Sequence, residues 1–417
     1  MYNLREAKYV SIYLNIVVFL AAFVSIVLWP AYSITVPAYV LVYLGFPLIF
    51  WHSMHTHKQF VKEFFFILLI YVVLNGLAQL NNVLSHLQLN DVITLTEPGN
   101  TGKVILRPTL FSQSVYLFAG ILLYLYLKYY GTKNHLNIYY WALRVLVAYG
   151  FLEVIIFQIT GHNGDFLSNR EFNHVPGTGS LFQTMLIGGH AIQRLKSLTG
   201  EPSMFALTIV PFWILATGLK RKIDVILFLI ALILTFSTSA FLGIFIFLCA
   251  WFARKAMKDK KWLLVFPAAI VVLAIILFIP SLHNIFNEMI WYKITGANQS
   301  GSDRSSFFHN HITYWKNLNF PGKLFGIGFG YIRSTDFFST LLVNNGIIGI
   351  LVFTIFFFKH AYVKFIDKDL KYYYVTALVA TYLIMMVSVP EFAYLSTWIL
   401  LALPYVVKRN QLLRRNM

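Results

Sequence analysis

The stretch Arg194-Leu-Lys-Ser-Leu-Thr-Gly-Glu-Pro-Ser-Met-Phe-Ala206 joins a charged segment to a long apolar run. Pro202 suits the first position of a helix, because the first turn leaves its amide groups unpaired in any case. Gly200 predicts a break in whatever helix precedes it. We therefore expect a charged, water-facing segment followed by a membrane helix from Pro202 onward. The positive dipole end of that helix makes Glu201 a better candidate for a base or an ion partner than for an acid.

The composition of the 417-residue chain places it in a membrane. Hydrophobic residues make up 58% of the sequence and charged residues only 12%, too few to cover a soluble fold. Twelve apolar runs have a length that suits membrane-spanning helices. They lie at residues 9–28, 33–51, 63–81, 110–127, 137–160, 203–219, 222–237, 238–253, 262–280, 337–358, 372–389 and 391–407. We expect an all-α polytopic membrane protein of about twelve transmembrane helices, organised as a single integral membrane domain over residues 1–417.

Positive charge is concentrated on one side of this predicted topology. With the N-terminus inside, most of the 33 Lys and Arg residues fall in cytoplasmic segments, and both termini are cytoplasmic. The formal net charge of +17 is therefore a positive-inside signal, and nucleic-acid binding loses its support. The seventh and eighth runs meet at Ser237-Thr238-Ser239, where a hairpin rather than one bent helix keeps the charge pattern consistent.

Three long outer loops, 82–109, 161–202 and 281–336, form the expected active-site region, because most inner loops are short. In the last of these loops, apolar residues recur at helical spacing over 282–290 and 308–315. We expect two amphipathic helices that lie on the membrane surface.

Ser302 or Asp303 is predicted to cap the second of these amphipathic helices. Either cap places Arg304 in the first turn of that helix.

Outer arginines and lysines suit a phosphate ligand. Arginine binds phosphate oxygens through a bidentate fork and keeps its proton, so it matches a lipid pyrophosphate at the bilayer surface. The alternative is that these cations anchor loops to lipid headgroups or pair with outer carboxylates.

Two ionisable residues, Arg144 and Glu153, fall inside the fifth span. They lie on opposite helix faces and are not expected to pair with each other. Glu153 either lines a substrate cavity or makes a structural hydrogen bond.

Metal and nucleotide sites are not expected. His52, His55 and His57 lack a carboxylate or cysteine at ligand spacing. The glycines of Gly326-Ile-Gly328-Phe-Gly330 lack both a preceding strand and a following Gly-Lys-Ser/Thr. We expect neither a metal nor a cofactor.

Several short motifs follow one another between residues 194 and 349, on the predicted outer side. They are Arg194 with Glu201-Pro202-Ser203, Ser237-Thr238-Ser239, Arg304 with Trp315, the Leu324–Gly330 element, and Asp336 before Gly346-Ile-Ile-Gly349. In order and spacing this set resembles the O-antigen polymerase and ligase superfamily of bacterial polysaccharide assembly.

The resemblance implies the GT-C-like helical fold of lipid-dependent membrane glycosyltransferases and a metal-independent, inverting transfer. The expected reaction moves a growing glycan from polyprenyl pyrophosphate onto the next lipid-linked repeat unit, on the outer face of the bacterial cytoplasmic membrane. Ligases of this superfamily carry a histidine just before the final helix, whereas this chain has Thr335-Asp336, which favours a polymerase. A ligase that transfers glycan to a lipid or protein acceptor, and a flippase for lipid-linked sugars, remain the alternatives.

The resemblance and the outer-side charges together assign the candidate site residues. Pyrophosphate binding is assigned to Arg194 and Arg304, with Lys196 and Arg333 as helpers. The candidate bases are Glu201 first, followed by Asp336 and His311. Expected partners are polyprenyl-pyrophosphate-linked oligosaccharides and membrane lipids, with a chain-length regulator as a further candidate.

Overall fold

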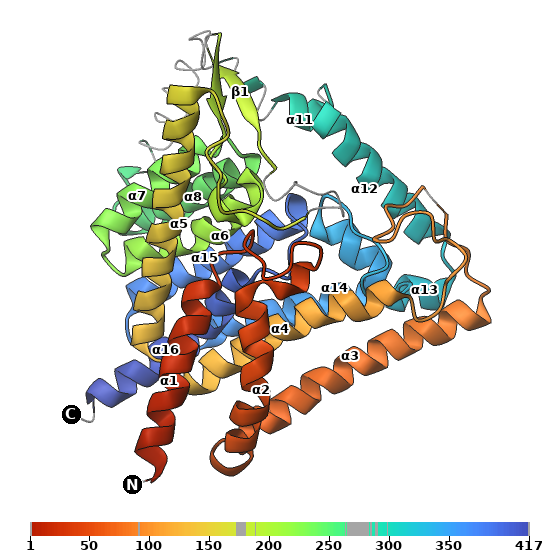
Figure 1. Ribbon diagram of the computed structural model, residues 1–417, viewed down its shortest axis with the longest axis horizontal. Coiled ribbons are helices and arrows are strands. Elements are labelled where there is room, and N and C mark those ends of the chain that lie inside the picture. The colour runs from red at the N-terminus through yellow and green to blue at the C-terminus, as the bar shows by residue number, and fades with distance from the viewer. Residues whose placement is uncertain are drawn as a thin grey trace.

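The structure is a computed structural model that describes residues 2–90, 92–171, 181–187, 189–262, 291–297 and 299–415, with a few single positions between 264 and 287. The described chain is mostly helical, and the ends marked N and C lie at the same end of the helical bundle (Figure 1). The principal helices are α1 (Tyr2–Leu20), α2 (Pro37–Thr56), α3 (Lys58–Leu84), α4 (Pro108–Tyr130), α5 (Lys133–Thr160), α6 (Pro202–Gly218), α7 (Lys222–Leu234), α8 (Thr238–Lys258), α14 (Phe337–Phe358), α15 (Lys368–Val387) and α16 (Leu395–Arg415).

Shorter elements connect the principal helices. They are η1 (Ser33–Thr35), β1 (Thr184–Ile187), β2 (His190–Gln193), η2 (Ser197–Thr199), α11 (Tyr292–Thr295), α12 (Gln299–Asn317), α13 (Phe320–Phe325) and η4 (Lys359–Tyr362). β1 and β2 form an antiparallel hairpin in the second outer loop, which the sequence analysis did not predict.

The protein is a helical, polytopic membrane protein. Within the described residues, seven helices are long and apolar enough to cross a membrane: α2, α3, α4, α5, α8, α14 continued through η4, and α15. The apolar part of α1 and the whole of α6 are shorter. Each predicted run in the described chain overlaps a helix, whereas the run 262–280 lies outside the described residues apart from its first positions.

Exposed apolar side chains mark the surface that faces lipid. α3 runs along the edge of the molecule (Figure 1) and exposes Phe65, Phe66, Leu69 and Val72, among others. A patch of this size on a water-soluble protein would drive association, whereas acyl chains solvate it without cost.

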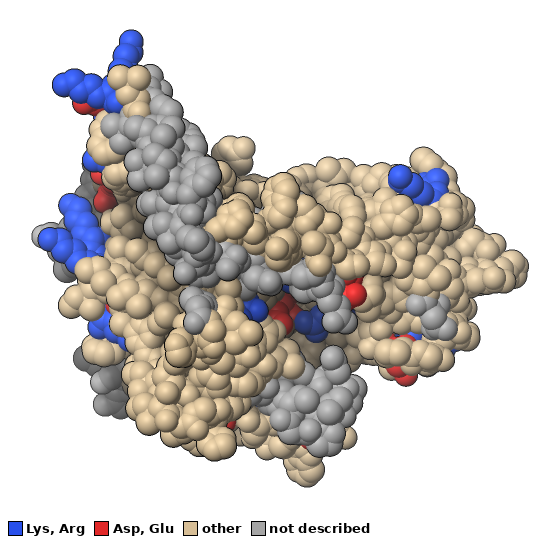
Figure 2. All heavy atoms as spheres, turned by 90° about the horizontal axis from the view of Figure 1, so that it is seen from above, with Lys and Arg blue, Asp and Glu red and all other residues tan. Residues whose placement is uncertain are grey.

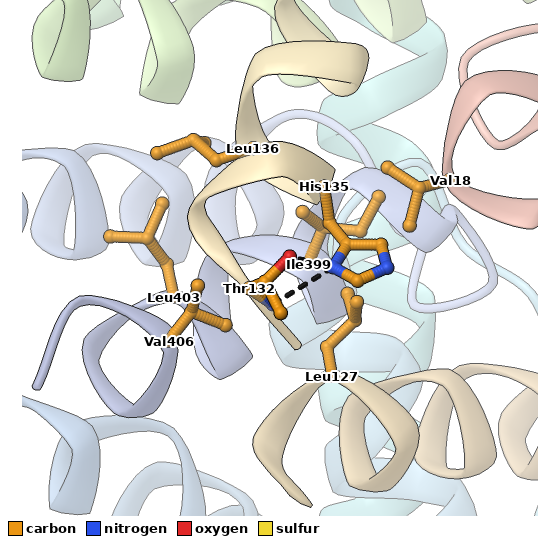
Figure 3. Close-up of a pocket in the computed structure, with 8 residues that line it drawn as sticks. All are labelled: Val18, Leu127, Thr132, His135, Leu136, Ile399, Leu403 and Val406. Atoms are coloured by element: carbon orange, nitrogen blue, oxygen red, sulfur yellow. Dashed lines mark hydrogen bonds between the residues drawn. The ribbon is translucent and has the colours of Figure 1, made fainter. Parts of the chain in front are cut away.

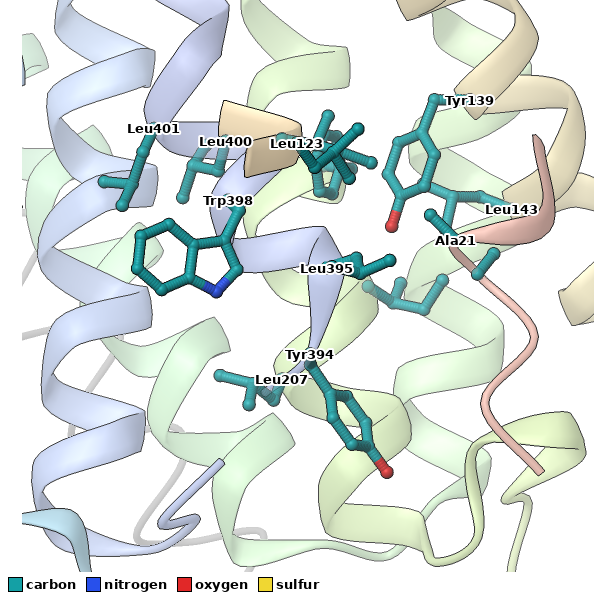
Figure 4. Packing of buried hydrophobic residues seen from close by; sticks show 14 of the residues in the cluster. Ala21, Leu123, Tyr139, Leu143, Leu207, Tyr394, Leu395, Trp398, Leu400 and Leu401 are labelled. Carbon is teal, nitrogen blue, oxygen red and sulfur yellow. The ribbon is translucent and has the colours of Figure 1, made fainter. Parts of the chain in front are cut away.

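α6 is the central helix of the bundle. It is buried without interruption from Met204 to Ala216, and it packs against α15, α7 and α8. Because α6 is apolar on every face, neighbours can pack against all of its sides. Figure 4 shows Leu207 of α6 beside Tyr394 and Trp398, which lie at the beginning of α16. The stretch that begins at Arg194 therefore leads directly into the core.

The predicted end of the first span, at residue 28, is wrong. Helix α1 stops at Leu20, and residues 21–27 continue without a helix although they are largely buried. The amides of Val24 and Ser25 donate to the Leu198 carbonyl, at 2.9 and 3.0 Å. This partner replaces the hydrogen bonds that a continued helix would supply.

The seventh and eighth runs form two helices, α7 and α8, as the sequence predicted. Residues 235–237 separate them, and the two helices contact each other as well as α6.

Helix α14 is interrupted at Gly346, whose φ of 65° and ψ of −167° are accessible only to glycine. A Cβ at this position would lie 2.3 Å from the Leu324 carbonyl oxygen. Gly326, with a φ of 73°, lies on the other side of the same contact. A Cβ at Gly326 would lie 2.4 Å from the Asn344 backbone. The glycines of the Leu324–Gly330 element thus permit close backbone packing against α14.

Gly346→Ala is expected to lower the free energy of unfolding by about 3 kcal/mol, because alanine cannot adopt this backbone conformation without strain. Gly76→Ala is the matched control, since nothing lies within 4 Å of its Cβ position in α3. The control should stabilise the helix by about 0.5–1 kcal/mol. Thermal unfolding in detergent measures both, and equal midpoints for the two variants would contradict the packing role.

Candidate functional site

The segment between Arg194 and α6 is buried among the helices, so the expectation that it faces water is wrong. Residues 195–200 are all buried. The Leu195 amide donates to the Leu234 carbonyl at 2.9 Å, and the Tyr394 hydroxyl donates to the Thr199 carbonyl at 2.6 Å. Because neighbouring elements supply hydrogen bonds to its backbone, the segment does not need water.

The predicted break and restart of the helix are confirmed. Gly200 has a φ of 97°, and Pro202 occupies the first turn of α6, with Glu201 as the N-cap residue.

Lys196 is fully buried in an ion-paired group instead of joining the other candidate cations. Its Nζ donates to Asp165 and lies 3.6 Å from Glu153 Oε1. Glu153 also accepts a hydrogen bond from the Ser197 amide at 3.0 Å. Burial alone would raise the pKa of Asp165, but the Lys196 ammonium and the hydrogen bonds from Ser168 together outweigh that effect and lower it. Lys196 therefore holds the buried segment in place.

The two ionisable residues of the fifth span are paired with different partners, as their opposite faces predicted. Glu153 is fully buried beside Lys196, whereas Arg144 donates to Asp224 at 2.6 Å. Of the two alternatives for Glu153, the structure shows the structural hydrogen bond.

Lys196→Met should lower the free energy of unfolding by about 3–5 kcal/mol, because it leaves two buried carboxylates without their cation. Adding Asp165→Asn should restore part of the loss. Lys316→Met, at an exposed position, should change stability by no more than about 0.5 kcal/mol. Chemical denaturation measures all three, and a fully stable Lys196→Met protein would show that this lysine has no structural role.

Arg194 is positioned by the β1–β2 hairpin and by the end of α7. Its amide extends the hairpin ladder to the Gln183 carbonyl at 2.9 Å, and its Nε donates to the Thr235 carbonyl at 3.0 Å. Burial lowers the pKa of the guanidinium to about 10, with nearby Glu201 opposing the shift and Arg304 adding to it. Arg194 remains charged at neutral pH and lies within electrostatic reach of both residues.

Arg304 approaches the same region from α12. Its Nη1 donates to the Ser388 carbonyl at 3.3 Å, and the Ser388 hydroxyl lies 2.7 Å from that of Ser239. The serine junction before α8 and the arginine of the third outer loop, far apart in sequence, are therefore neighbours. The cap predicted at Ser302 or Asp303 is wrong, because α12 begins at Gln299 and includes Arg304 beyond its first turn. The first predicted amphipathic helix, 282–290, lies largely outside the described residues.

Arg333 brings further charges to the region. It forms an ion pair with Glu391 and is 47% exposed. Burial lowers its pKa, Arg170 lowers it further, and Glu201 opposes the shift. Protein atoms therefore surround the Arg333 side chain, although water still reaches it. Such an environment is typical of a residue in the wall of a surface hollow.

Electrostatic interactions connect these charges with Glu201. Figure 2 shows Lys or Arg atoms and Asp or Glu atoms together at the bottom of a hollow, within a largely uncharged surface. Glu201 acts to raise the pKa of both Arg194 and Arg333. Arg304 lowers the pKa of Arg194, and Arg170 lowers the pKa of Arg333. With Glu391, four arginines and two carboxylates leave an excess of two positive charges. We call these six residues the arginine cluster.

Glu201 is the carboxylate of the arginine cluster best placed to exchange a proton. Its side chain accepts a hydrogen bond from the Ser203 hydroxyl but makes no cap bond to α6. It is only partly buried, so one carboxylate oxygen remains available to an incoming hydroxyl group.

Asp336 and His311 are engaged in other interactions. Asp336 caps α14, accepting from the Ser339 amide at 2.6 Å and from the Ser339 and Ser334 hydroxyls. His311 is fully buried, and its Nε2 accepts from the Thr94 amide at 3.1 Å. Burial lowers the pKa of His311, although Asp336 opposes the shift. Both residues therefore support the structure of the outer loops.

The folded state should become less stable in acid because of His311. Its pKa is lowered in the folded chain, so below about pH 6.5 the unfolded chain binds a proton that the folded chain resists. The unfolding midpoint should therefore fall as the pH falls below that value, and His311→Gln should reduce this dependence. His309→Gln, an exposed position two residues earlier on α12, serves as the control and should keep the wild-type dependence. Identical pH profiles for all three proteins would refute this account.

Two members of the arginine cluster, Glu391 and Arg170, were not predicted as site residues. Glu391 falls within a predicted span, and Arg170 is one of the cations of the second outer loop. One signal was present, because Pro390-Glu391 interrupts the apolar run after α15 much as Glu201-Pro202 precedes α6.

A cavity within the bundle is too small for a sugar donor. Figure 3 shows a cavity of about 20 Å³ where α4, α5 and α16 meet, with the His135 ring turned toward Thr132 and apolar side chains around it. This volume holds about one water molecule. Within the described residues, no group of three or more His, Cys, Asp or Glu side chains is arranged to hold a metal ion.

Comparison with protein-family models, curated proteins and solved structures found no match to this chain.

Proposed function

We propose that this protein is a polysaccharide polymerase with the GT-C-like fold of lipid-dependent membrane glycosyltransferases. It transfers a growing glycan from polyprenyl pyrophosphate to the next lipid-linked repeat unit at the outer face of the bacterial cytoplasmic membrane. The observation that carries the proposal is the arginine cluster, in which Glu201 lies within electrostatic reach of Arg194 and Arg333.

The charge of the arginine cluster matches the proposed donor. A pyrophosphate that links a lipid to a sugar carries two negative charges, and the cluster has an excess of two positive charges. Arg194 and Arg304 bind the pyrophosphate, since each guanidinium can donate to phosphate oxygens through a planar fork. Their side chains enter from the second and third outer loops, so the donor lies between elements far apart in sequence.

Glu201 acts as the general base. The acceptor hydroxyl attacks the anomeric carbon of the donor sugar while the bond from that carbon to the pyrophosphate oxygen breaks. Glu201 takes the hydroxyl proton, and the pyrophosphate leaves with the electron pair of the broken bond. Negative charge grows on the leaving group, where Arg194 and Arg304 stabilise it. The glycosyl pyrophosphate bond supplies the energy, so the reaction does not consume a nucleotide.

Arg194→Ala, Arg304→Ala and Glu201→Gln should each slow chain growth by about ten- to a hundredfold, because each removes a charge-assisted interaction or the proton acceptor. The assay uses purified protein and lipid-linked repeat units, with product length followed on gels. Lys316→Ala, an exposed outer cation of α12, is the control and should keep wild-type activity. Wild-type chain growth in all three site variants would exclude the assignment.

A deletion strain distinguishes polymerase, ligase and flippase. Surface glycan that stops at one repeat unit supports the polymerase. Long glycan without its final acceptor supports a ligase, and accumulation at the inner leaflet supports a flippase.

A further inference from the structure

A second charged pocket lies between the beginning of α5 and the beginning of α7, with a volume of about 990 Å³. We call it the α5–α7 basic pocket and define it by Trp141, Arg144, Lys220, Arg221, Lys222 and Ile223. It belongs to the end of the bundle where the α4–α5 turn meets α16, because Arg409 donates to the Gly131 carbonyl at 2.7 Å. The sequence predicts that this end is cytoplasmic. The pocket is thus separate from the arginine cluster.

One buried carboxylate holds the two arginines of the pocket in place. Arg144 donates through Nε and Nη2 to the two oxygens of Asp224, at 2.6 and 3.1 Å. Arg221 donates to Asp224 at 3.4 Å and also to Asn137. Asp224 is fully buried, whereas the arginine side chains are 28% and 25% exposed. Both guanidinium groups are therefore fixed while part of each remains open to the pocket.

Aromatic rings contact the same two cations. The guanidinium of Arg144 lies 4.6 Å from the Trp141 ring centroid, and that of Arg221 lies 4.1 Å from the Tyr140 centroid. Such contacts orient a guanidinium without neutralising it.

The pocket carries an excess of positive charge. Arg144, Lys220, Arg221 and Lys222 contribute four charges, and Asp224 removes one, which leaves three. Lys220 and Lys222 are exposed and have no carboxylate within ion-pair distance in the described chain. An anion with several oxygens, such as a phosphate group, suits these donors.

Apolar side chains beside the charges indicate that the anion belongs to an amphiphile. Trp141 is 59% exposed and Ile223 is 73% exposed. Each of them is the first residue of an exposed apolar stripe along its helix. The stripe on α5 consists of Trp141, Val145, Leu152, Ile155 and Ile159, and the stripe on α7 consists of Ile223, Ile226, Ile230 and Ile233. Acyl chains can lie along such stripes, whereas a free phosphate would gain nothing from them.

We propose that the α5–α7 basic pocket binds the phosphate headgroup of an anionic membrane lipid, with the acyl chains along the exposed stripes of α5 and α7. A cationic pocket at the membrane boundary, adjoined by an exposed tryptophan, has the chemistry for this ligand. The site does not depend on the proposed enzymatic activity.

The test compares lipids that differ only in headgroup charge. Full-length protein in detergent is titrated with phosphatidylglycerol or phosphatidylcholine of the same chain length, and retained lipid is counted by native mass spectrometry. Wild-type protein should retain phosphatidylglycerol preferentially. Lys220→Gln with Lys222→Gln should require about ten- to thirtyfold more phosphatidylglycerol, because each cation near an anionic lipid contributes about one kcal/mol. Both lysines are exposed, so the fold should be preserved.

Lys258→Gln with Lys260→Gln is the matched control, because it removes two exposed cations at the same spacing from the end of α8. It should retain phosphatidylglycerol as the wild type does. Inorganic phosphate should not displace the lipid. Equal retention of both lipids, equal losses in both double variants, or displacement by inorganic phosphate would each overturn the proposal.

Discussion

The buried ion pair between Lys196 and Asp165 allows an irregular segment, with only the short helix η2, to cross the interior of a helical membrane protein. An irregular backbone among apolar helices is costly unless its polar groups find partners, and a buried ammonium is costlier still. Here Asp165 and Glu153 surround the ammonium, and α5 and α7 supply backbone partners. Arg194 and Glu201 stand at the two ends of this fixed segment, so their separation is set by the core.

The first and third outer loops are tied to one another in a comparable way. The Arg333 amide donates to the Thr94 carbonyl, and the Thr94 amide donates to His311, so the first and third loops share one framework. The side chain of Arg333 then reaches Glu391 in the connection between α15 and α16. Because these ties involve backbone groups and buried side chains, the charges in the hollow are held by the fold and do not need a ligand to order them.

Local signals in the sequence predicted much of this structure. Apolar length predicted the helices, and Gly200 with Pro202 predicted the start of α6, because those properties depend on neighbouring residues alone. The early end of α1 and the burial of Lys196 depend on partners far along the chain, which a local pattern does not specify. Residue type likewise could not distinguish the roles of Arg194 and Lys196, which lie two residues apart. Arg194 belongs to the arginine cluster, whereas Lys196 is ion-paired within the core. Glu391 was missed because its apolar neighbours made it part of a span.

The arginine cluster draws its side chains from widely separated parts of the chain, with Arg170 and Arg194 preceding α6 and Arg304, Arg333 and Glu391 following α8. The shortest contiguous fragment that contains the complete set extends from residue 170 to residue 391. During synthesis the complete set of charges is therefore present only after α15 has been made. A nascent chain that ends before Glu391 would carry an incomplete cluster, and the proposed chemistry would be silent in it.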